Sequence, residues 1–403
     1  MKRRKFVGMG GLAISSLAVQ PENAYSNFLK NSNTVKVGVI GTGGRGNWLI
    51  KLIKDIPGLE VTACCDVLPF RLKQGISLSA PSAKAYSEYQ ELLNDKDIDA
   101  VIISTPLSMH YQMAVEALDA GKHVYCEKTM TFTIDEALKL EEKVKGSNLK
   151  FQVGYQHRYN PLYQNIYNTV NEGYLGTVTH VEAHWNRNGN WRRPVPDPQF
   201  EKLINWRMYE EYSGGLMAEL CSHQIDLIDF ILNSHAQKIT GMGGIDYYKD
   251  GRETFDNIYT LLEYPGGLKA SFHSITTNGH EGFNVKIFGT KAAIVVKGEA
   301  SHKGFIYPEP AVIQELMNEV DGVSSATMKV LEAGEPIPII IEDFPEGDDG
   351  PTSAALENFG KCITDDLDPI ANVEFGKKSA ITVALANKSM REGTIEHWQE
   401  AYS

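Results

Sequence analysis

The sequence predicts an N-terminal doubly wound α/β sheet and a C-terminal α+β part with a large, mostly antiparallel sheet. Two observations support this fold class. Up to residue 153, short apolar strands alternate with amphipathic helices, as in parallel sheets that helices cover on both faces. After Gly154 the alternation stops, and longer segments with partial period-two hydrophobicity follow, with helices expected on one face. The predicted segments are residues 1–33, 34–154 and 155–403, the last ending in helices that return to pack.

Length and composition agree with a folded protein of two domains. The chain has 403 residues, of which 42% are hydrophobic and 22% are charged, so wholesale disorder is excluded. The net charge of −12 and the lack of a local basic stripe predict no binding of nucleic acid. The five cysteines are too few for a disulfide framework and lack zinc-ligand spacing, and we predict no metal site.

Residues 1–33 have the layout of an export signal. A basic cluster at residues 2–5 contains Arg3-Arg4-Lys5, which resembles a twin-arginine signal, and it precedes a mildly apolar run, 6–19. That run is shorter than the roughly 20 residues of a spanning helix, so we predict no transmembrane span. The protein is then periplasmic or otherwise exported. A basic tail on a cytoplasmic protein and retention of the signal as an anchor stay open, because no clean cleavage site precedes Thr34.

A glycine-rich turn at the start of the first domain predicts a dinucleotide site. A β-branched run, 35–40, leads into Gly41-Thr42-Gly43-Gly44-Arg45-Gly46 and then a helical pattern. In this context, Gly41 makes a tight turn, Gly43 admits the pyrophosphate and Gly46 lets the helix pack on the strand. Asp66 ends the next strand, where it can bind a ribose 2′-hydroxyl and repel a 2′-phosphate. The site therefore predicts NAD rather than NADP, although Arg71 lies close in sequence.

The remaining elements follow from the same periodicities. In the first half we expect strands at 59–65, 83–86, 99–104, 123–126 and 151–153, and helices at 70–78, 89–93, 109–120 and 134–144. In the second half we expect strands at 177–185, 239–247, 257–263, 268–275 and 283–288. Residues 299–352 are expected to form loops and a helix around 312–331, and the tail is expected to form helices at 354–363 and 377–390.

The order of motifs resembles the Gfo/Idh/MocA oxidoreductase family (glucose–fructose oxidoreductase, inositol dehydrogenase and relatives). The similar stretches are the glycine turn with Asp66, Thr105-Pro106 with His110, Glu127-Lys128-Thr129, and the segment from Gly214 to Asp226. The resemblance implies a Rossmann domain followed by a sheet domain, and an NAD(P)-dependent oxidoreductase of carbohydrate substrates. It also implies further cofactor contacts beyond the glycine turn, from Thr105, Pro106, His110, Glu127 and Lys128.

Three residues are the candidate catalytic groups. The resemblance implies that Lys128 hydrogen-bonds the reacting hydroxyl. Glu219 and His223 lie four apart in a helical stretch, so a carboxylate can orient an imidazole that acts as general base. Thr129 stands where the family usually has proline, and Glu219 where it generally has aspartate.

Two aromatic and polar stretches, 155–161 and 185–193, are candidate parts of a substrate site, and Trp206 with Arg207 are further candidates for the same wall. The candidate substrate-binding residues are His157, Arg158, Tyr159, Trp191, Trp206 and Arg207. Asn160 and Pro161 are expected to start the next helix. His180, Glu182 and His184 alternate in a strand, so they share one face, which we place near the substrate.

The leading hypothesis is an NAD-dependent oxidoreductase that moves hydride between a tightly bound cofactor and a hydroxyl of a sugar, glycoside or polyol. Tight binding follows from export, because an exported enzyme has no free NAD pool. One alternative is an NAD-dependent glycosidase or lyase, in which oxidation is transient and no net redox change occurs. Another is a non-catalytic sugar or nucleotide sensor. The uncovered face of the second sheet makes a homodimer or homotetramer the expected assembly.

Overall fold

The computed structural model of the chain describes residues 34–298, 303–310, 336–341, 344–345, 347 and 349–402. The predicted export signal, 1–33, and the predicted helix around 312–331 lie outside the described residues.

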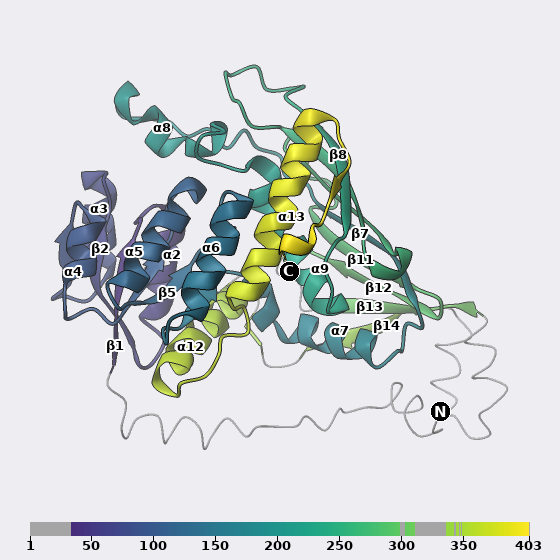
Figure 1. Ribbon diagram of the computed structural model, residues 1–403, viewed down its shortest axis with the longest axis horizontal. Coiled ribbons are helices and arrows are strands. Elements are labelled where there is room, and N and C mark those ends of the chain that lie inside the picture. Colours follow the sequence, from purple (N-terminus) through teal and green to yellow (C-terminus); the bar gives the residue numbers. More distant parts are fainter. Residues whose placement is uncertain are drawn as a thin grey trace.

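The first half is a six-stranded parallel sheet with helices on both faces, as the alternating pattern predicts (Figure 1). Its strands are β1 (Val35–Ile40), β2 (Leu59–Cys65), β3 (Lys84–Tyr86), β4 (Ala100–Ile103), β5 (His123–Cys126) and β6 (Phe151–Val153). Its helices are α2 (Gly44–Ile53), α3 (Pro69–Leu78), α4 (Tyr89–Asn94), α5 (His110–Asp119) and α6 (Ile134–Lys145). The strand order is β3-β2-β1-β4-β5-β6. Strands β2 and β3 are added on one side of β1, and β4 to β6 are added on the other side, so the order switches between β1 and β4. Ligands bind at such a switch point, at the carboxyl ends of the strands.

The second half is a nine-stranded sheet in the order β14-β13-β12-β11-β7-β10-β9-β8-β15. Its strands are β7 (Val178–Trp185), β8 (Lys238–Gly244), β9 (Asn257–Glu263), β10 (Lys269–Ile275), β11 (Phe283–Gly289), β12 (Ala292–Lys297), β13 (Lys303–Pro308), β14 (Ile337–Ile340) and β15 (Glu396–His397). Neighbouring strands are antiparallel except β7 and β10, which are parallel. The prediction of a mostly antiparallel second sheet is confirmed.

Several details of the second sheet differ from expectation, and strands β12 and β15 form where no strand was predicted. The strand predicted at 239–247 ends at Gly244, because the N–H groups of Tyr247 and Tyr248 turn to the carboxylate of Asp256, at 2.9 Å each. In the segment predicted as loops and one helix, β13 and β14 pair with each other and extend the sheet. These short strands contain glycine and proline, so their sequence alone carries little strand signal.

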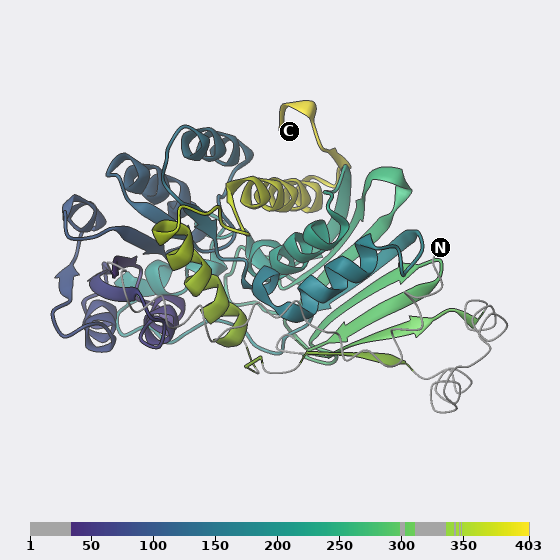
Figure 2. The same ribbon diagram turned by 90° about the horizontal axis from the view of Figure 1, so that it is seen from below.

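Helices cover one face of the nine-stranded sheet, and no helix among the described ranges covers the other (Figure 2). The covering helices are α7 (Pro161–Asn171), α9 (Ser222–Leu232) and α13 (Val373–Glu392). Helix α7 starts as predicted, with Pro161 in its first turn and the Asn160 carboxamide accepting from the N–H of Leu162 at 2.9 Å.

The C-terminal helices join the two sheets. Helix α12 (Asp349–Thr364) packs on α2 and β1, and its buried Ala355 carbonyl accepts from Gln152 Nε2 at 2.7 Å. Helix α13 contacts both α6 of the first half and β8 of the second. The carboxyl edge of the first sheet therefore has a fixed position relative to α9.

Candidate active site

A cleft of about 450 Å³ lies at the switch point of the six-stranded sheet. Seven of the predicted cofactor residues line it, namely Gly41, Gly43, Gly44, Arg45, Asp66, Thr105 and Pro106. Gly46 does not line the cleft but packs beneath it. A Cβ at Gly46 would lie 2.0 Å from the Gly41 carbonyl oxygen, so this position requires glycine for helix α2 to approach the strand.

Asp66 is held by backbone at the end of β2. Its carboxylate accepts from the N–H groups of Thr42 and Leu68, at 2.8 and 2.9 Å, and from the Thr42 hydroxyl. A carboxylate offers about four acceptor positions, so one remains for a ribose hydroxyl. The glycine turn, the N-terminus of α2 and this carboxylate together fit NAD.

A π-helical turn, η6 (Met217–Cys221), holds the loop that carries Lys128. In this turn the Ala218 carbonyl accepts from three side chains: Lys128 Nζ at 3.3 Å, the Thr129 hydroxyl at 3.2 Å and the Ser222 hydroxyl at 2.6 Å. Lys128 Nζ also donates to the Glu219 carbonyl at 2.9 Å. Such π-helical turns recur at functional sites because they redirect backbone carbonyls. Thr129, which departs from the family's proline, follows a cis peptide bond and ties the loop to this turn through its hydroxyl.

The three candidate catalytic residues line one pocket of about 230 Å³ beside the cofactor cleft. Lys128, Glu219 and His223 meet there with His110, Glu127, Trp206 and Arg207. The pocket and the cleft share lining residues, namely Arg45, Ser104, Thr105, Trp206 and Arg207. A group bound in the pocket would therefore adjoin a group bound at the inner end of the cleft.

Glu219 does not orient His223, contrary to the predicted pairing of carboxylate and imidazole. Its carboxylate instead accepts from Arg207 Nε at 2.6 Å. Burial alone would raise the pKa of this carboxyl, but Arg207, Lys128 and His110 bring the pKa below its usual value. The π-helical turn ends between Glu219 and His223. Their four-residue spacing therefore does not place the two side chains on one helix face, as it would in a continuous α-helix.

His223 is a buried, neutral imidazole among aromatic rings. Its ring lies edge-on to His157 with centroids 5.2 Å apart, and 5.6 Å from Trp185. Burial, and then the charge of Lys128, hold the pKa of His223 well below its usual value. Nδ1 is buried without a hydrogen-bond partner among the described residues. A neutral imidazole of this kind accepts a proton only from a group that enters the pocket.

Burial also lowers the pKa of the Lys128 ammonium, against the opposing charges of Glu219 and Glu127. A lysine with a lowered pKa can lose and regain a proton during a reaction. Its two backbone acceptors fix where Nζ stands.

Two predicted cofactor residues have internal partners at the pocket wall. Glu127 accepts from Arg45 Nε at 2.5 Å, so the glycine turn and the Lys128 loop are joined by an ion pair. His110 is buried, and its ring nitrogens face the carbonyls of Thr129 and Thr105 at 2.8 and 3.1 Å. The His110 ring thus links the two motifs that border the pocket.

Three predicted substrate residues lie elsewhere. Arg158 is buried with Asp226, its Nε and Nη2 both 2.8 Å from the carboxylate, and it does not line the pocket. The Tyr159 hydroxyl is bound inside the protein. It donates to Asn358 Oδ1 on α12 and accepts from the N–H of Ala371, just before α13, at 3.2 Å each. His157 is buried behind His223. The predictions that Arg158 and Tyr159 bind substrate are wrong, since their polar groups are used in the core.

The other predicted substrate residues do face solvent-accessible space. Trp206 and Arg207 line the pocket that holds Lys128 and His223, and Trp191 lines an adjoining hollow of about 240 Å³. The structure adds Gln156, Trp185 and Arg187 to the pocket wall. Trp185 and Arg187 belong to the aromatic and polar stretch noted in the sequence, but nothing in that stretch distinguished them from their neighbours.

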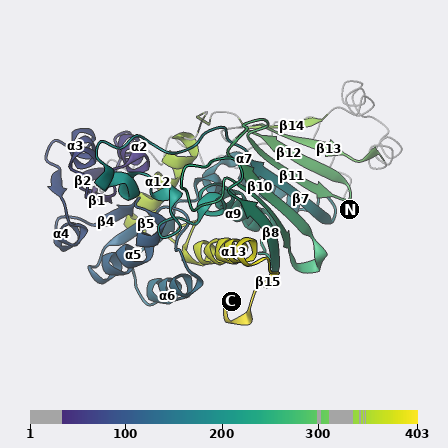
Figure 3. The same ribbon diagram turned by 90° about the horizontal axis from the view of Figure 1, so that it is seen from above.

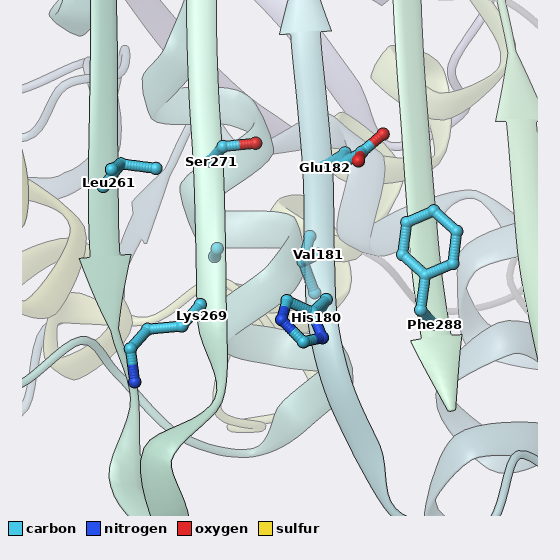
Figure 4. Close-up of a pocket in the computed structure, with 8 residues that line it drawn as sticks. His180, Val181, Glu182, Leu261, Lys269, Ser271 and Phe288 are labelled. Carbon is cyan, nitrogen blue, oxygen red and sulfur yellow. The ribbon is translucent and has the colours of Figure 1, made fainter. Parts of the chain in front are cut away.

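The row of His180, Glu182 and His184 is formed as predicted, but it is not near the pocket. His180 and Glu182 stand on the uncovered face of the nine-stranded sheet, on β7 beside residues of β9, β10 and β11 (Figure 4). Helix α9 and His223 lie on the covered face. The strand alternation assigned a common face correctly but could not determine which face it was.

Within the described ranges, no three His, Cys, Asp or Glu side chains are grouped to hold a metal ion. Among the same residues, no helix is long and apolar enough to cross a membrane.

The cleft at the switch point and the adjoining pocket define a dinucleotide-binding protein with a second, sheet-based half. Residues 35–155 match the family model described as an oxidoreductase family with an NAD-binding Rossmann fold. Residues 163–295 match the model of the GFO/IDH/MocA C-terminal domain. The chain therefore belongs to the Gfo/Idh/MocA family of NAD-binding oxidoreductases.

Three similar proteins illustrate the range of the family. Inositol 2-dehydrogenase of Salmonella typhimurium is 32% identical over 188 residues, which cover 44% of this chain and 56% of that enzyme. A glycosyl hydrolase family 109 protein of Shewanella pealeana is 31% identical over 185 residues, 44% of this chain and 40% of that protein. Levoglucosan dehydrogenase, solved with NADH and L-sorbose, has the same fold, with a TM-score of 0.76 at 16% identity over 92% of this chain and 100% of that one.

Proposed function

We propose that the protein transfers hydride between a hydroxyl-bearing carbon of a sugar, glycoside or polyol and bound NAD. The observation that carries this proposal is the meeting of Lys128 and His223 in a pocket that shares lining residues with the dinucleotide cleft. The similarity to inositol 2-dehydrogenase supports a polyol or sugar as the substrate class.

Lys128 is proposed to hold the reacting hydroxyl. Its ammonium has backbone acceptors on one side and the pocket on the other, so a substrate oxygen can complete its hydrogen bonds. Its lowered pKa favours the neutral amine, which can accept the hydroxyl proton as a carbonyl forms and return that proton in the reverse direction. When bound, NAD supplies the hydride acceptor.

His223 is proposed as the second proton acceptor and as a positioning group. Being neutral, it can accept a hydrogen bond from the same hydroxyl or from a neighbouring one. The Glu219–Arg207 pair contributes fixed charge next to Lys128, and Arg207 covers Trp206 with its guanidinium 4.1 Å from the ring centroid. The pocket thus combines aromatic rings with hydrogen-bond donors, and the two together suit a sugar ring.

The alternative is a redox-neutral glycosidase or lyase, which oxidises a sugar carbon, eliminates at the neighbouring position and returns the hydride. The similarity to a glycosyl hydrolase family 109 protein favours this alternative. The same pocket serves both reactions, so the products distinguish them. A ketosugar accumulates in the first, and a cleaved glycoside without net NADH forms in the second.

The test is to denature purified protein, identify any released nucleotide, and incubate native protein with a panel of polyols and glycosides. Dehydrogenase function predicts NADH absorbance together with a ketosugar. Binding of sugar with no chemical change, and no loss of function in Lys128→Ala, would support a sensor instead.

We propose that a second copy of the chain covers the open face of the nine-stranded sheet, in a homodimer or a homotetramer. Large apolar side chains are exposed across adjacent strands, with Met242 80%, Leu261 59% and Tyr259 53% accessible. A hollow of about 440 Å³ lies beside Leu261 on β9 and extends to Phe288 on β11 (Figure 4). Exposed apolar patches of this kind mark interaction surfaces.

We also propose that the protein is exported with its cofactor bound, on the strength of the basic cluster at residues 2–5 and the apolar run that follows it. Fractionation of cells that produce the full chain tests the proposal. Protein in the periplasm is expected, and replacement of Arg3 and Arg4 by lysine should keep it in the cytoplasm.

A further inference from the structure

The segment between β7 and η6 reaches from the nine-stranded sheet to the dinucleotide cleft. Figures 1 and 3 show its short helix α8 (Glu201–Ile204) near the nucleotide-binding half. Two contacts dock the segment there: the Phe200 ring packs edge-on against Phe70 of α3 at 6.3 Å, and the Ser108 N–H donates to the Tyr212 carbonyl at 3.3 Å. The segment also lines the cleft, through Arg193, Lys202, Leu203, Ile204, Trp206, Arg207 and Tyr212.

Two guanidinium groups face the glycine turn from opposite halves of the molecule. A Cβ at Gly43 would lie 3.7 Å from Nη1 of Arg71, and one at Gly44 would lie 3.7 Å from Nη1 of Arg193. Arg71 comes from α3 and Arg193 from the docked segment. Neither guanidinium has a carboxylate or hydrogen-bond partner within the described part of the chain. Burial and the like charges of Arg193 and Arg207 lower the pKa of Arg71, whereas Asp66 opposes this.

Arg193 is held in place by its backbone and its neighbours. Its N–H and carbonyl are bound by the buried Asn205 side chain, at 2.7 and 2.9 Å. Arg192 forms ion pairs with Glu201 and Asp250, which fix the next residue along the chain. The guanidinium is therefore presented to the cleft by an ordered loop, which lowers the entropy cost of binding a ligand.

We propose that Arg71 and Arg193 form a clamp on the pyrophosphate of NAD, closed from both halves of the molecule, and that this clamp keeps the cofactor bound. The N-terminus of α2 would hold the same group through backbone N–H groups. Guanidinium groups bind phosphate oxygens through charge-assisted, often bidentate hydrogen bonds. The inference rests on the proposed function for NAD as the resident cofactor.

The test measures how fast NADH leaves the full-length protein, by following its fluorescence after mixing with excess NAD. Arg193→Ala and Arg71→Ala are each expected to speed release about tenfold or more, since each loses charged hydrogen bonds. The matched control is Lys73→Ala, which removes one positive charge from exposed α3 surface outside the cleft. It should release NADH at the wild-type rate. Reduced nicotinamide riboside, which has no phosphate, should bind wild type and Arg193→Ala equally.

Two results would overturn the clamp. One is that both arginine variants release NADH at the wild-type rate. The other is that Arg193→Ala weakens binding of the riboside as much as binding of NADH, which would show a general opening of the segment rather than loss of phosphate contacts. If Arg193→Ala does not fold, Arg193→Lys and Arg71→Ala decide the question by the same measurements. If the wild-type protein binds no dinucleotide at all, the proposed function fails, and that outcome is distinct from a failure of the clamp.

Discussion

Lys128 is the residue whose side chain the proposed chemistry depends on most directly. Lys128→Ala should lower kcat by about 10²–10⁴-fold, because the reacting hydroxyl loses its proton acceptor. NADH binding should change little, since the glycine turn and Asp66 remain. Steady-state kinetics and NADH fluorescence titration check the two parts separately. Lys139→Ala, in an exposed helical ion pair, is the control for loss of a lysine. Wild-type turnover in Lys128→Ala would contradict the proposed role.

The pH dependence should report the same group. Burial lowers the pKa of Lys128, and oxidation requires its unprotonated form. We therefore expect kcat/KM for alcohol oxidation to rise with pH and to level off below the ordinary lysine pKa. His223, with its pKa far below the usual histidine value, should add no step near neutral pH. A pH–rate profile of wild type and Lys128→Ala checks this, and an unchanged rise in the variant would assign the titration to another group.

At the residue scale, motifs predicted the site more reliably than residue types did, since of the residues chosen by type Trp206 and Arg207 line the pocket but Arg158 and Tyr159 do not. Lys128, His223 and the glycine turn were found because their positions in a motif carry chemical meaning. Arg158 was misassigned because its partner, Asp226, is 68 residues away, and only the fold brings them together. The Glu219–Arg207 pair was missed for a related reason, since the two residues lie 12 apart in different elements, and only the fold brings them together.

Helix α9, which carries His223, is held by a buried ion pair. Arg158 binds Asp226 on α9 and is packed against Phe375 of α13, with its guanidinium 4.0 Å from the ring centroid. Asp226→Ala should destabilise the protein by about 3–5 kcal/mol, because it leaves a buried guanidinium without its charge partner. Denaturant unfolding measures this loss.

The double variant Arg158→Met/Asp226→Leu should regain part of that stability, since both charges leave the core. If Asp226→Ala unfolds at the wild-type denaturant concentration, the pair does not hold the helix in this way.

At the element scale, local pattern predicted the first sheet well, because five of its six strands are mostly buried and read as apolar runs, the exception being the exposed edge strand β3. The second sheet was predicted only where strands alternate clearly. Strands β13 and β14 escaped because their stability comes from pairing across the sheet and not from their own residues. Strand β15 is only two residues long and pairs with β8, more than 150 residues earlier.

For the whole molecule, the uncovered sheet face makes a specific prediction about assembly. Leu261→Arg and Met242→Arg each place a charge in the exposed apolar patch, so the combined variant should shift the protein to monomers. Light scattering coupled to size-exclusion chromatography measures the mass. The matched control is Ile395→Arg, an exposed apolar residue outside the sheet. A wild-type protein that is already monomeric would contradict an assembly through this face.

The arrangement of two sheets around one cleft gives the molecule its proposed function. The first sheet supplies the dinucleotide site, the second supplies η6 and α9, and the docked segment closes the cleft between them. The acidic net charge of −12 contrasts with this cleft, where Arg45, Arg71, Arg193 and Arg207 gather. Local basic charge in an acidic protein favours a bound anion such as a dinucleotide.

The most direct test of hydride transfer is a single turnover with a polyol or glycoside deuterated at its hydroxyl-bearing carbons. The protein is loaded with NAD, and the bound nucleotide and sugar are analysed by mass spectrometry. Hydride transfer predicts deuterium on the nicotinamide with wild type, or deuterium returned to a cleaved sugar if the reaction is redox-neutral, and neither with Lys128→Ala. NAD that stays bound and undeuterated while every sugar of the panel is recovered unchanged would contradict hydride transfer.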